Sequence, residues 1–156
     1  MLMLGIETSC DETSAAVVSE TGGRWTIGSN IVASQVNIHR EWGGVVPELA
    51  SRQHLTLLPE MVDRALDEAG IAPEDLSAVA VTRAPGLVGS LVVGVAFAKA
   101  YAMALGIPVV GVNHIEAHLL APLLEGARFE FPTVGAVVSG GHSEIFVVHA
   151  LGRYEI

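Results

Sequence analysis

The segment Leu2-Met-Leu-Gly-Ile-Glu-Thr-Ser-Cys-Asp-Glu-Thr-Ser-Ala-Ala-Val-Val-Ser19 decides the fold, because a polar turn in it separates two apolar runs. The runs Leu2–Thr8 and Ser14–Ser19 have the length of strands, and the turn Ser9–Thr13 is rich in acids and hydroxyl groups. This pattern predicts a β-hairpin. Its tip is either a solvated turn or a place where functional groups gather.

A third strand and a long helix are expected after this hairpin. The residues Trp25–Ser34 predict a strand that completes an antiparallel trio, and the glycines in His39–Gly44 indicate a loop. A helix is expected from Pro47, which suits a first helical position, to Gly70, where a glycine can end it. One face of this helix is predicted to be buried, because apolar residues recur along it with a helical period: Leu58, Val62, Ala65, Leu66 and Ala69.

The middle of the chain predicts a strand, a glycine-bearing turn and a second helix. Ala78–Thr82 is apolar and β-branched, and the turn Arg83–Gly89 leads into a helix over Ser90–Leu105, whose small residues predict close packing on a sheet. The turn either presents backbone N–H groups to an anion or serves this close packing. The apolar run Leu87–Val112 is interrupted by Lys99, by glycines that include Gly89, Gly94 and Gly106, and by Pro108, which favours a buried helix and a buried strand over a membrane span.

A second hairpin is expected near the end of the sequence. Thr133–Val138 and Glu144–His149 are apolar runs of strand length, and Ser139-Gly-Gly-His142 lies between them as a tight turn. A Ser-Gly-Gly tip lets the backbone approach a ligand closely, although an ordinary hairpin turn has the same composition. The order of elements predicts an α/β fold with a mixed sheet and helices on its faces. With polar hairpin turns near both ends, we expect a ribonuclease-H-like lobe of the actin-like ATPase fold (ASKHA).

Two histidines lie four residues apart where the expected strand Ile107–Val112 gives way to a helix. His114 and His118 would share one face of that helix, with Cβ atoms roughly 5–6 Å apart, so both rings can ligate one metal ion. The other interpretation is a pair of packed or hydrogen-bonded histidines at a helix start. Glu116 lies roughly 200° around the helix from His114, so the HExxH arrangement of a zincin metallopeptidase is missing.

Composition and charge restrict the functions that the chain can have. Its 156 residues are 51% hydrophobic, enough for one domain or lobe with a real core. The 17 acidic and 8 basic residues give a net charge of −9, so the chain has no surface that would grip nucleic acid by itself. The single Cys10 and the early acids, where a signal peptide would need a basic region, indicate a reducing compartment. We expect a cytoplasmic protein. If its substrate is a nucleic acid, the basic surface must come from a partner or from a missing part of the protein.

Five motifs, which cover essentially the whole chain, occur in the order typical of one protein family. They are Gly5-Ile-Glu-Thr-Ser-Cys-Asp-Glu-Thr13, Gly43-Gly-Val-Val-Pro-Glu-Leu-Ala-Ser-Arg-Gln-His54, Pro85-Gly-Leu-Val-Gly-Ser90, Asn113-His-Ile-Glu-Ala-His118 and Val138-Ser-Gly-Gly-His142. The chain resembles the TsaD family of bacterial tRNA threonylcarbamoyladenosine transferases, formerly called sialoglycoprotein endopeptidases. The resemblance implies that residues 1–156 form the N-terminal lobe of a two-lobed protein, whose C-terminal lobe is absent from this chain.

The resemblance also implies an activity and the residues that serve it. The family transfers a threonylcarbamoyl group from threonylcarbamoyl-AMP to N6 of the adenosine beside the anticodon, position 37, in tRNAs that read ANN codons. His114 and His118 match its metal ligands, for one divalent ion per subunit with iron favoured and zinc as the alternative, while the third ligand, an aspartate, belongs to the other lobe. Asp11 and Glu12 match acids near its active site. The loop that holds the adenylate matches residues Val137, Val138, Ser139, Gly140 and Gly141.

The transfer needs a group that takes the proton of the attacking amine. His142, Asp11 and Glu12 are the candidates, and the sequence does not rank them. The partners that the resemblance implies are threonylcarbamoyl-AMP, tRNA bound through the full-length complex, a TsaB-like paralogue and a TsaE-like ATPase. A homodimer of this chain is a further expectation, and no membrane is expected.

Three other functions have to be weighed against this one. A metallopeptidase, as the family was once described, needs a glutamate that is misplaced here. A sugar kinase or chaperone-type ATPase of the same fold needs no HxxxH. A non-catalytic dimerisation lobe of the TsaB type lacks the histidine pair, so His114 and His118 discriminate between it and the transferase. The isolated lobe is expected to be inactive in either case.

Overall fold

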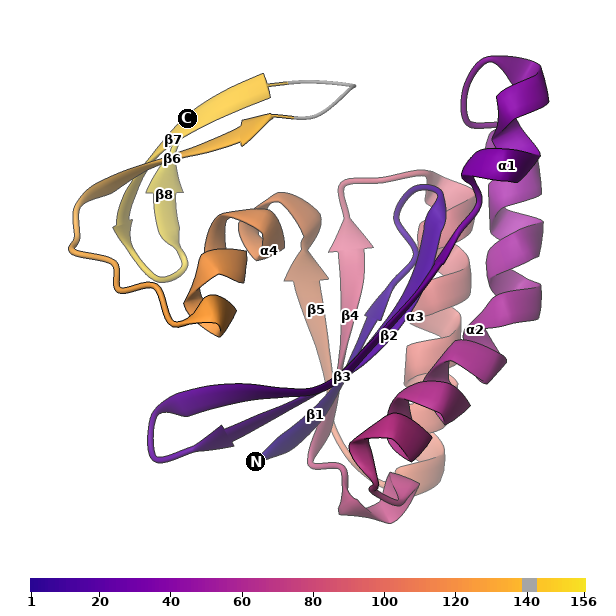
Figure 1. The fold of residues 1–156 in the computed structure, drawn as a ribbon, viewed down its shortest axis with the longest axis horizontal. Coiled ribbons are helices and arrows are strands. Elements are labelled where there is room, and N and C mark those ends of the chain that lie inside the picture. Colours follow the sequence, from indigo (N-terminus) through magenta and orange to yellow (C-terminus); the bar gives the residue numbers. More distant parts are fainter. Residues whose placement is uncertain (139–142) are drawn as a thin grey trace. The chain divides into compact units, whose positions relative to one another are not determined.

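The computed structural model describes residues 1–138 and 143–156, and the chain forms two units, Met1–Asn113 and His114–Ile156. The turn predicted at Ser139–His142 lies outside the described residues. The first unit contains a five-stranded sheet with the strand order β3-β2-β1-β4-β5 (Figure 1). Its strands are β1 (Leu2–Glu7), β2 (Glu12–Thr21), β3 (Arg24–Ser34), β4 (Ala78–Ala84) and β5 (Val109–Asn113).

The N-terminal hairpin sets the register of this sheet. β1 pairs antiparallel with β2, which pairs antiparallel with β3, while β4 lies parallel to β1 and β5 parallel to β4. The β1–β2 ladder ends with Glu7 opposite Ser14, so the residues between them form a tip beyond the carboxyl end of β1. The predicted hairpin, antiparallel trio and mixed sheet are confirmed.

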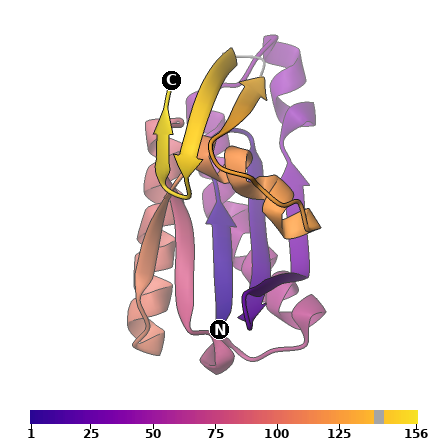
Figure 2. The same ribbon diagram turned by 90° about the vertical axis from the view of Figure 1, so that its left-hand side faces the viewer.

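Two long helices cover one face of the sheet, as Figures 1 and 2 show. α2 (Pro47–Ala69) packs on β2 and β3, α3 (Val88–Leu105) packs on β4, and the two helices contact each other. The single-turn helix η2 (Pro73–Asp75) leads from α2 to β4. As predicted, α2 begins with Pro47 and ends at Gly70, whose φ of 66° is the left-handed conformation of a helix C-cap.

The core of the first unit lies between the sheet and these helices. Leu4, Val17 and Val79 come from three neighbouring strands and are at most 1% exposed. Leu58 and Val62 of α2 belong to the same core cluster, as their helical spacing predicted. Burying an aliphatic side chain of this size contributes roughly 1.5–3 kcal/mol, so the hairpin and α2 stabilise each other.

α3 approaches the sheet through small residues. Its buried residues are Ser90, Gly94, Ala98 and Ala102, each four positions after the last and therefore on one face. A Cβ atom on Gly94 would lie 2.3 Å from Thr8 Oγ1, so the helix could not come this close with any other residue there. The close packing that the sequence predicted is confirmed.

The rest of α3 and the neighbouring strand β5 are less buried than expected. α3 is long and apolar enough to cross a membrane, judged by length and composition alone. Val92 is 61% exposed and Met103 81%. β5 is an edge strand, and its Val109 and Val110 are 36% and 48% exposed. The prediction of a buried strand is therefore wrong, because a strand at the edge of a sheet has a neighbour on one side only.

The segment before α2 also differs from the prediction. A helical turn, α1 (Val36–His39), and a single-turn helix, η1 (Arg40–Trp42), replace the expected loop. Gly43 has a φ of 71° and ends the turn, whereas Gly44 has no positive φ. The prediction of a loop is therefore wrong. It assumed that both glycines adopt unusual backbone angles, whereas Gly43 alone of the two is left-handed, and it ends a helical turn as a C-cap.

The second unit packs a short helix against a three-stranded antiparallel sheet. Its elements are α4 (His114–Leu120), η3 (Ala121–Glu125), β6 (Thr133–Val138), β7 (Ser143–Ala150) and β8 (Arg153–Glu155). Leu119 of α4 forms a small core with Val137, Phe146 and Val148. The helix and the strands β6 and β7 were predicted. β8 was not, because three residues are too few to show a period.

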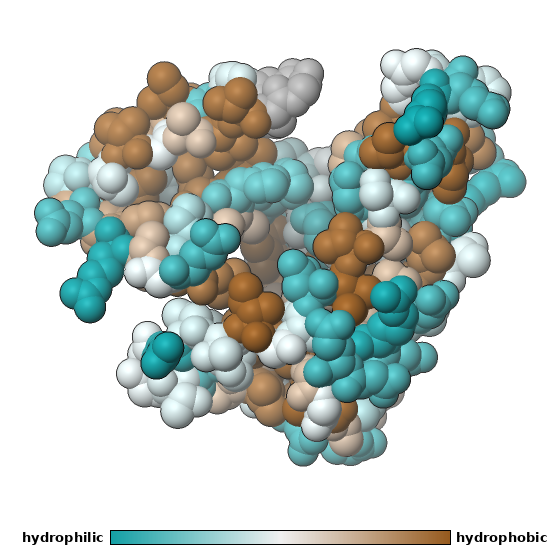
Figure 3. Space-filling model, viewed as in Figure 1, coloured by the Kyte–Doolittle hydropathy of each residue, from teal (hydrophilic) through white to brown (hydrophobic). Residues whose placement is uncertain are grey.

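The sheet of the second unit has one buried and one exposed apolar face. Val134, Val138 and Ile145 are 70%, 80% and 67% exposed, whereas Val137 and Phe146, which alternate with them along the strands, are buried. Figure 3 shows hydrophobic side chains gathered over these strands. The residues of this unit therefore close a core on one face of its sheet only.

Candidate active site

The acidic tip, residues Ser9–Glu12, joins β1 to β2 and is held by its backbone. The carbonyl groups of Ser9, Cys10 and Asp11 each accept a hydrogen bond from a different part of the first unit. The donors are, in order, the N–H of Leu87 at 2.8 Å, Nε2–H of His54 at 3.0 Å and the N–H of Gln35 at 2.9 Å. Three successive carbonyls fixed from three elements leave the backbone of the tip little freedom.

Glu7, the last residue of β1, also holds the tip. Its carboxylate accepts a hydrogen bond from the N–H of Ser9 and another, at 2.7 Å, from the hydroxyl of Thr82 on β4. Sequence reasoning did not single out Glu7. Its position could have indicated its role, because an acid at the end of an otherwise apolar strand needs hydrogen-bond donors once the strand is buried.

The glycine turn before α3 closes on the tip. A Cβ atom on Gly86 would lie 2.7 Å from both Cβ and O of Ser9. No side chain fits between the two segments, and the next residue, Leu87, donates its N–H to Ser9 O. Of the two interpretations of this turn, the structure supports close packing.

The crowded acids of the tip change the pKa of two of its side chains. Burial raises the pKa of the Glu12 carboxyl, and the charge of Asp11, a hydrogen bond with Asp11 and the charge of Glu7 raise it further. Burial also raises the pKa of the Cys10 thiol to about 11, with Asp11 and Glu12 adding to the effect. A carboxyl with a raised pKa is a better proton acceptor, whereas a thiol with a raised pKa is a poor nucleophile.

The histidine pair of α4 converges on one point. His118 Nε2 and His114 Nε2 are 3.1 Å apart, with ring centroids 4.5 Å apart and ring planes at 84°. An ion about 2.0–2.1 Å from each nitrogen would subtend an angle of roughly 100° between them, which suits tetrahedral or octahedral coordination. The geometry therefore fits a metal with two of its ligands on this helix.

The described residues supply no third ligand. Within 1–138 and 143–156, no three His, Cys, Asp or Glu side chains gather as a metal site would require. Glu116 is directed elsewhere, with Oε1 3.9 Å from the position that a Cβ on Gly152 would take. This agrees with the helical spacing that argued against a zincin.

A pocket of about 210 Å³, with both polar and apolar surface, lies beside His118 in the second unit. Leu119, Phe129 and Val148 are among its apolar lining residues, and Gly135 of β6 also lines it. A Cβ on Gly135 would lie 2.7 Å from Leu119 Cδ2, so a larger residue there would require the Leu119 side chain to move. The pocket can take a small group next to the histidine pair.

The predicted substrate-binding loop is described in part. Val137 is 8% exposed and packs in the core of the second unit, so only its backbone can meet a ligand, while Val138 is 80% exposed at the end of β6. Ser139, Gly140, Gly141 and His142 lie outside the described residues. Their predicted roles stay predictions.

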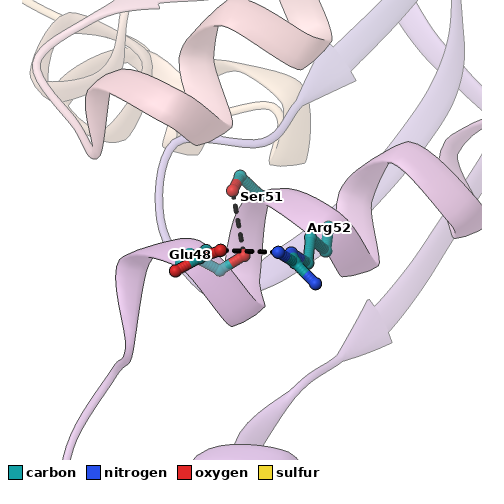
Figure 4. Close-up of polar contacts among 3 residues, drawn as sticks. All are labelled: Glu48, Ser51 and Arg52. Carbon is teal, nitrogen blue, oxygen red and sulfur yellow. Dashed lines mark hydrogen bonds and ion pairs between the residues drawn. The ribbon is translucent and has the colours of Figure 1, made fainter.

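The first turn of α2, which belongs to the second sequence motif, carries an exposed ion pair (Figure 4). Arg52 Nη2 donates to Glu48 Oε1 at 2.6 Å, and Ser51 Oγ donates to the backbone oxygen of Glu48 at 3.0 Å. The side chains of Arg52 and Glu48 are 75% and 73% exposed. Two residues later His54 is fully buried, so the motif divides into a solvated face and a face that reaches the acidic tip.

Solved structures with similar folds define the class of protein. YeaZ from Pseudomonas aeruginosa matches with a TM-score of 0.57 at 23% identity, over 94% of this chain and 57% of that one. The Aquifex aeolicus PPX-GPPA enzyme matches with a TM-score of 0.55 at 13% identity, over 99% of this chain and 51% of that one. At such identities the likeness concerns the fold alone. The fold is that of a ribonuclease-H-like lobe of the actin-like class, as predicted.

Sequence comparison identifies the family within this class. Residues 26–156 match the family model of TsaD, tRNA N6-adenosine threonylcarbamoyltransferase. Proteins of that name from Anaeromyxobacter dehalogenans and Pelobacter propionicus are 54% and 57% identical over 154 residues, 99% of this chain. The chain belongs to the TsaD family. It spans about 45% of the length of these relatives.

Proposed function

We propose that this chain provides the N-terminal part of a transferase that moves a threonylcarbamoyl group from threonylcarbamoyl-AMP to N6 of adenosine 37 in tRNAs reading ANN codons. The observation that carries the proposal is the convergence of His114 and His118, with Nε2 atoms 3.1 Å apart, in a chain of the TsaD family. A non-catalytic pairing lobe has no need of two converging histidines. The metallopeptidase alternative is not favoured, because Glu116 does not join them.

The metal proposed for this pair is one divalent ion, iron in preference and zinc as the alternative, since imidazole ligands suit both. When bound, such an ion supplies Lewis acidity toward a carbonyl or phosphate oxygen. His114 and His118 would hold it through their Nε2 atoms, with further ligands from outside the described residues. The pocket beside His118 is proposed to receive a small part of the substrate.

The acidic tip is proposed to accept the proton of the attacking amine. An exocyclic amine becomes a better nucleophile as it loses a proton, and Glu12, whose pKa is raised by burial and by Asp11, is suited to accept one. The charge of Asp11 beside it favours the protonated form of Glu12. His142 remains a second candidate for this role. The backbone of Val137–Gly141 is proposed to steady the adenylate.

Partners are proposed from charge and from an exposed groove. A net charge of −9 provides no phosphate-binding surface, so tRNA would be bound through an assembly with a TsaB-like paralogue and a TsaE-like ATPase. A groove of about 350 Å³ between α2 and α3, with Leu55, Pro59, Val92 and Phe97 among its lining residues, is proposed as the pairing surface for the paralogue or for a second copy of this chain. The assembly is proposed to work in the cytoplasm.

The test is transfer of the group by the complete protein. The complete protein, the paralogue and the ATPase are incubated with threonylcarbamoyl-AMP and a tRNA transcript that reads an ANN codon, and the nucleosides are analysed by mass spectrometry. We expect threonylcarbamoyladenosine at position 37, and none in a matched transcript with guanosine there. Absence of the modified nucleoside with all components present would reject the proposed function.

A further inference from the structure

His54 of α2 is a fully buried histidine that the proposed chemistry does not use. Its Nδ1 lies 2.7 Å from the hydroxyl oxygen of Thr13, and its Nε2 lies 3.0 Å from the carbonyl oxygen of Cys10. Cys10 and Thr13 flank Asp11 and Glu12 in sequence. One rigid ring therefore bonds to the residue before the acid pair and to the residue after it.

The hydrogen bonds of this ring determine its tautomer. The carbonyl of Cys10 can only accept, so the hydrogen of the ring lies on Nε2. Nδ1 is then the acceptor, and the hydroxyl of Thr13 donates to it. In this neutral tautomer His54 has a donor and an acceptor on opposite sides of its ring.

A second buried histidine supports the same assignment. The Gln35 amide donates from Nε2 to Ala50 O at 3.5 Å, so its Oε1 is the atom that faces His39 Nε2 at 3.2 Å and accepts from it. His39 Nδ1 in turn accepts the N–H of Val46 at 3.3 Å. The Gln35 Nε2 also lies 3.3 Å from His54 Nδ1. Every donor in this network meets an acceptor.

We propose that His54 is a positioning residue, which holds the acidic tip from both ends so that Asp11 and Glu12 keep the arrangement in which they transfer protons. Its effect on catalysis rests on the proposed function, whereas its effect on the tip does not. Leu87 donates to the carbonyl of Ser9, and Gln35 donates to the carbonyl of Asp11 and, at 3.5 Å, to the hydroxyl of Thr13. Of these three residues, His54 is the one whose side chain bonds both to the residue before the acid pair and to the residue after it.

Protonation of His54 would change this arrangement. It would place an N–H at Nδ1, so the hydroxyl of Thr13 would have to accept instead of donate, and the new N–H would face the Gln35 amide nitrogen, which lies 3.3 Å from Nδ1. Burial lowers the pKa of His54, although the carbonyl of Cys10 and the charges of Glu7 and Asp11 raise it; the neighbouring His39 lowers it further. The neutral form that bridges the tip is therefore the form present at neutral pH.

Three variants of the complete protein separate the two bonds of His54. His54→Gln has an amide N–H that can reach the carbonyl of Cys10, whereas the shorter His54→Asn keeps a partner for Thr13 and loses that reach. Arg64→Gln, on the exposed face of the same helix, is the matched control. Thermal melts confirm that each variant is folded.

The first readout is the alkylation rate of Cys10, which needs no activity. Iodoacetamide is the reagent, and mass spectrometry of the tryptic peptide Met1–Arg24 reports on this thiol alone. The thiol pKa of about 11 depends on the ordered tip. Loosening the tip returns the thiol pKa toward about 8.5, which increases the fraction of thiolate at pH 8. A less basic thiolate is a weaker nucleophile, which offsets part of this gain. We therefore expect Cys10 of His54→Asn to react about tenfold faster than that of wild type at pH 8. His54→Gln and Arg64→Gln should stay within about twofold of wild type by the same reasoning.

The second readout is the ring itself. ¹⁵N NMR of the wild-type protein should show His54 as a single neutral tautomer with hydrogen on Nε2 from pH 7 to 8. Tautomer exchange at His54 over this range, or equal alkylation rates in wild type and His54→Asn, would overturn the proposal. Because the NMR measurement uses the wild-type protein, it tests the proposal even if His54→Asn does not fold.

The third readout connects the tip to catalysis. We expect His54→Asn to lower kcat about tenfold or more, within the range of groups that orient a catalytic residue, with unchanged metal content and little change in KM for tRNA. His54→Gln should recover most of the activity. If the wild-type protein transfers no threonylcarbamoyl group, the proposed function fails while the alkylation and NMR results still decide the role of His54. If transfer occurs and His54→Asn is as active as Arg64→Gln, the positioning role is rejected.

Discussion

His39 and His54 in the first unit differ from His114 and His118 in the second unit in how their ring nitrogens are used. The first two are 3% and 0% exposed, and hydrogen bonds within their own unit occupy both nitrogens of each ring. The other two turn their Nε2 atoms toward each other. The buried rings have no lone pair left for a metal, so they can only order other groups. The converging rings are arranged for a ligand that the first pair could not hold.

The largest expected effect is the loss of metal and activity from the second pair. In the complete protein, His114→Ala or His118→Ala should remove the bound metal and lower transferase activity by more than about 100-fold, beyond what loss of a supporting residue costs. The melting temperature should hardly change, because the pair is not in a core cluster. Metal analysis and thermal melts provide the check.

His149→Ala, another histidine of the second unit, is the control for these variants and should retain its metal. Should His114→Ala keep metal and activity but melt at a much lower temperature, the pair would be core histidines like those of the first unit. The contrast between the two pairs would then disappear.

The second prediction compares how firmly the two units are packed. Gly94→Ala places a Cβ 2.3 Å from Thr8 Oγ1 in the first unit, and overpacking of this kind costs about 1–3 kcal/mol of unfolding free energy. Gly135→Ala meets Leu119 Cδ2 at 2.7 Å, but this atom ends a flexible side chain, so the cost should be smaller. Urea unfolding measures both.

Gly44→Ala is the control for the packing comparison, because nothing lies within 4 Å of its added Cβ and its φ is not positive. Its unfolding free energy should equal or slightly exceed that of wild type. Equal costs for Gly94→Ala and Gly135→Ala would mean that the second unit is packed as rigidly as the first.

The third prediction concerns acid. Burial lowers the pKa of His54 below its ordinary value of 6.5, so the unfolded chain binds the proton more readily than the folded chain does. The stability that neutral His54 contributes above pH 6.5 is therefore lost as the pH falls below that value. The loss is about 1.4 kcal/mol for each pH unit by which the pKa of His54 in the folded chain lies below its ordinary value. Unfolding free energies between pH 5 and 7.5 should fall less steeply in His54→Gln than in wild type or Arg64→Gln. Equal slopes in all three would contradict a neutral, buried His54.

The smallest effect is expected at the exposed ion pair of the same helix. A double-mutant cycle of Glu48→Ala and Arg52→Ala should give a coupling of about 0.3–0.5 kcal/mol, as exposed pairs four residues apart do. This pair lies one turn of α2 before His54, so it shows how little a short hydrogen bond stabilises a protein when both partners are solvated. A coupling above about 1.5 kcal/mol would require that solvent be excluded from the pair.

Elements with a clear period or a cap were predictable from the sequence. The hairpin at Ser9–Thr13, the start of α2 at Pro47 and its end at Gly70 agree with the prediction because local rules determine them. The exposure of β5 was not predictable, since an apolar strand looks the same whether it lies at the centre or the edge of a sheet. Strand order depends on pairings between distant residues that no window of sequence contains.

The candidate site was predictable only where spacing fixes geometry. His114 and His118 are four residues apart on a helix, so the convergence of their rings follows from α-helical periodicity. The contacts of the acidic tip could not be found in this way, because Gln35, His54 and Leu87 reach it from three separate segments. Glu7 was missed for the same reason, since Thr82 on β4 is its partner.

The division of the chain at Asn113 has a consequence for how the protein is made. All five strands of the first sheet, both long helices and the described groups that hold the acidic tip precede the second unit in sequence. A ribosome adds about 5–20 residues per second, so the roughly 40 residues of the second unit need about 2–8 s. Many domains of this size fold within that time. The first unit can therefore fold as the nascent chain emerges, before the second unit has left the ribosome.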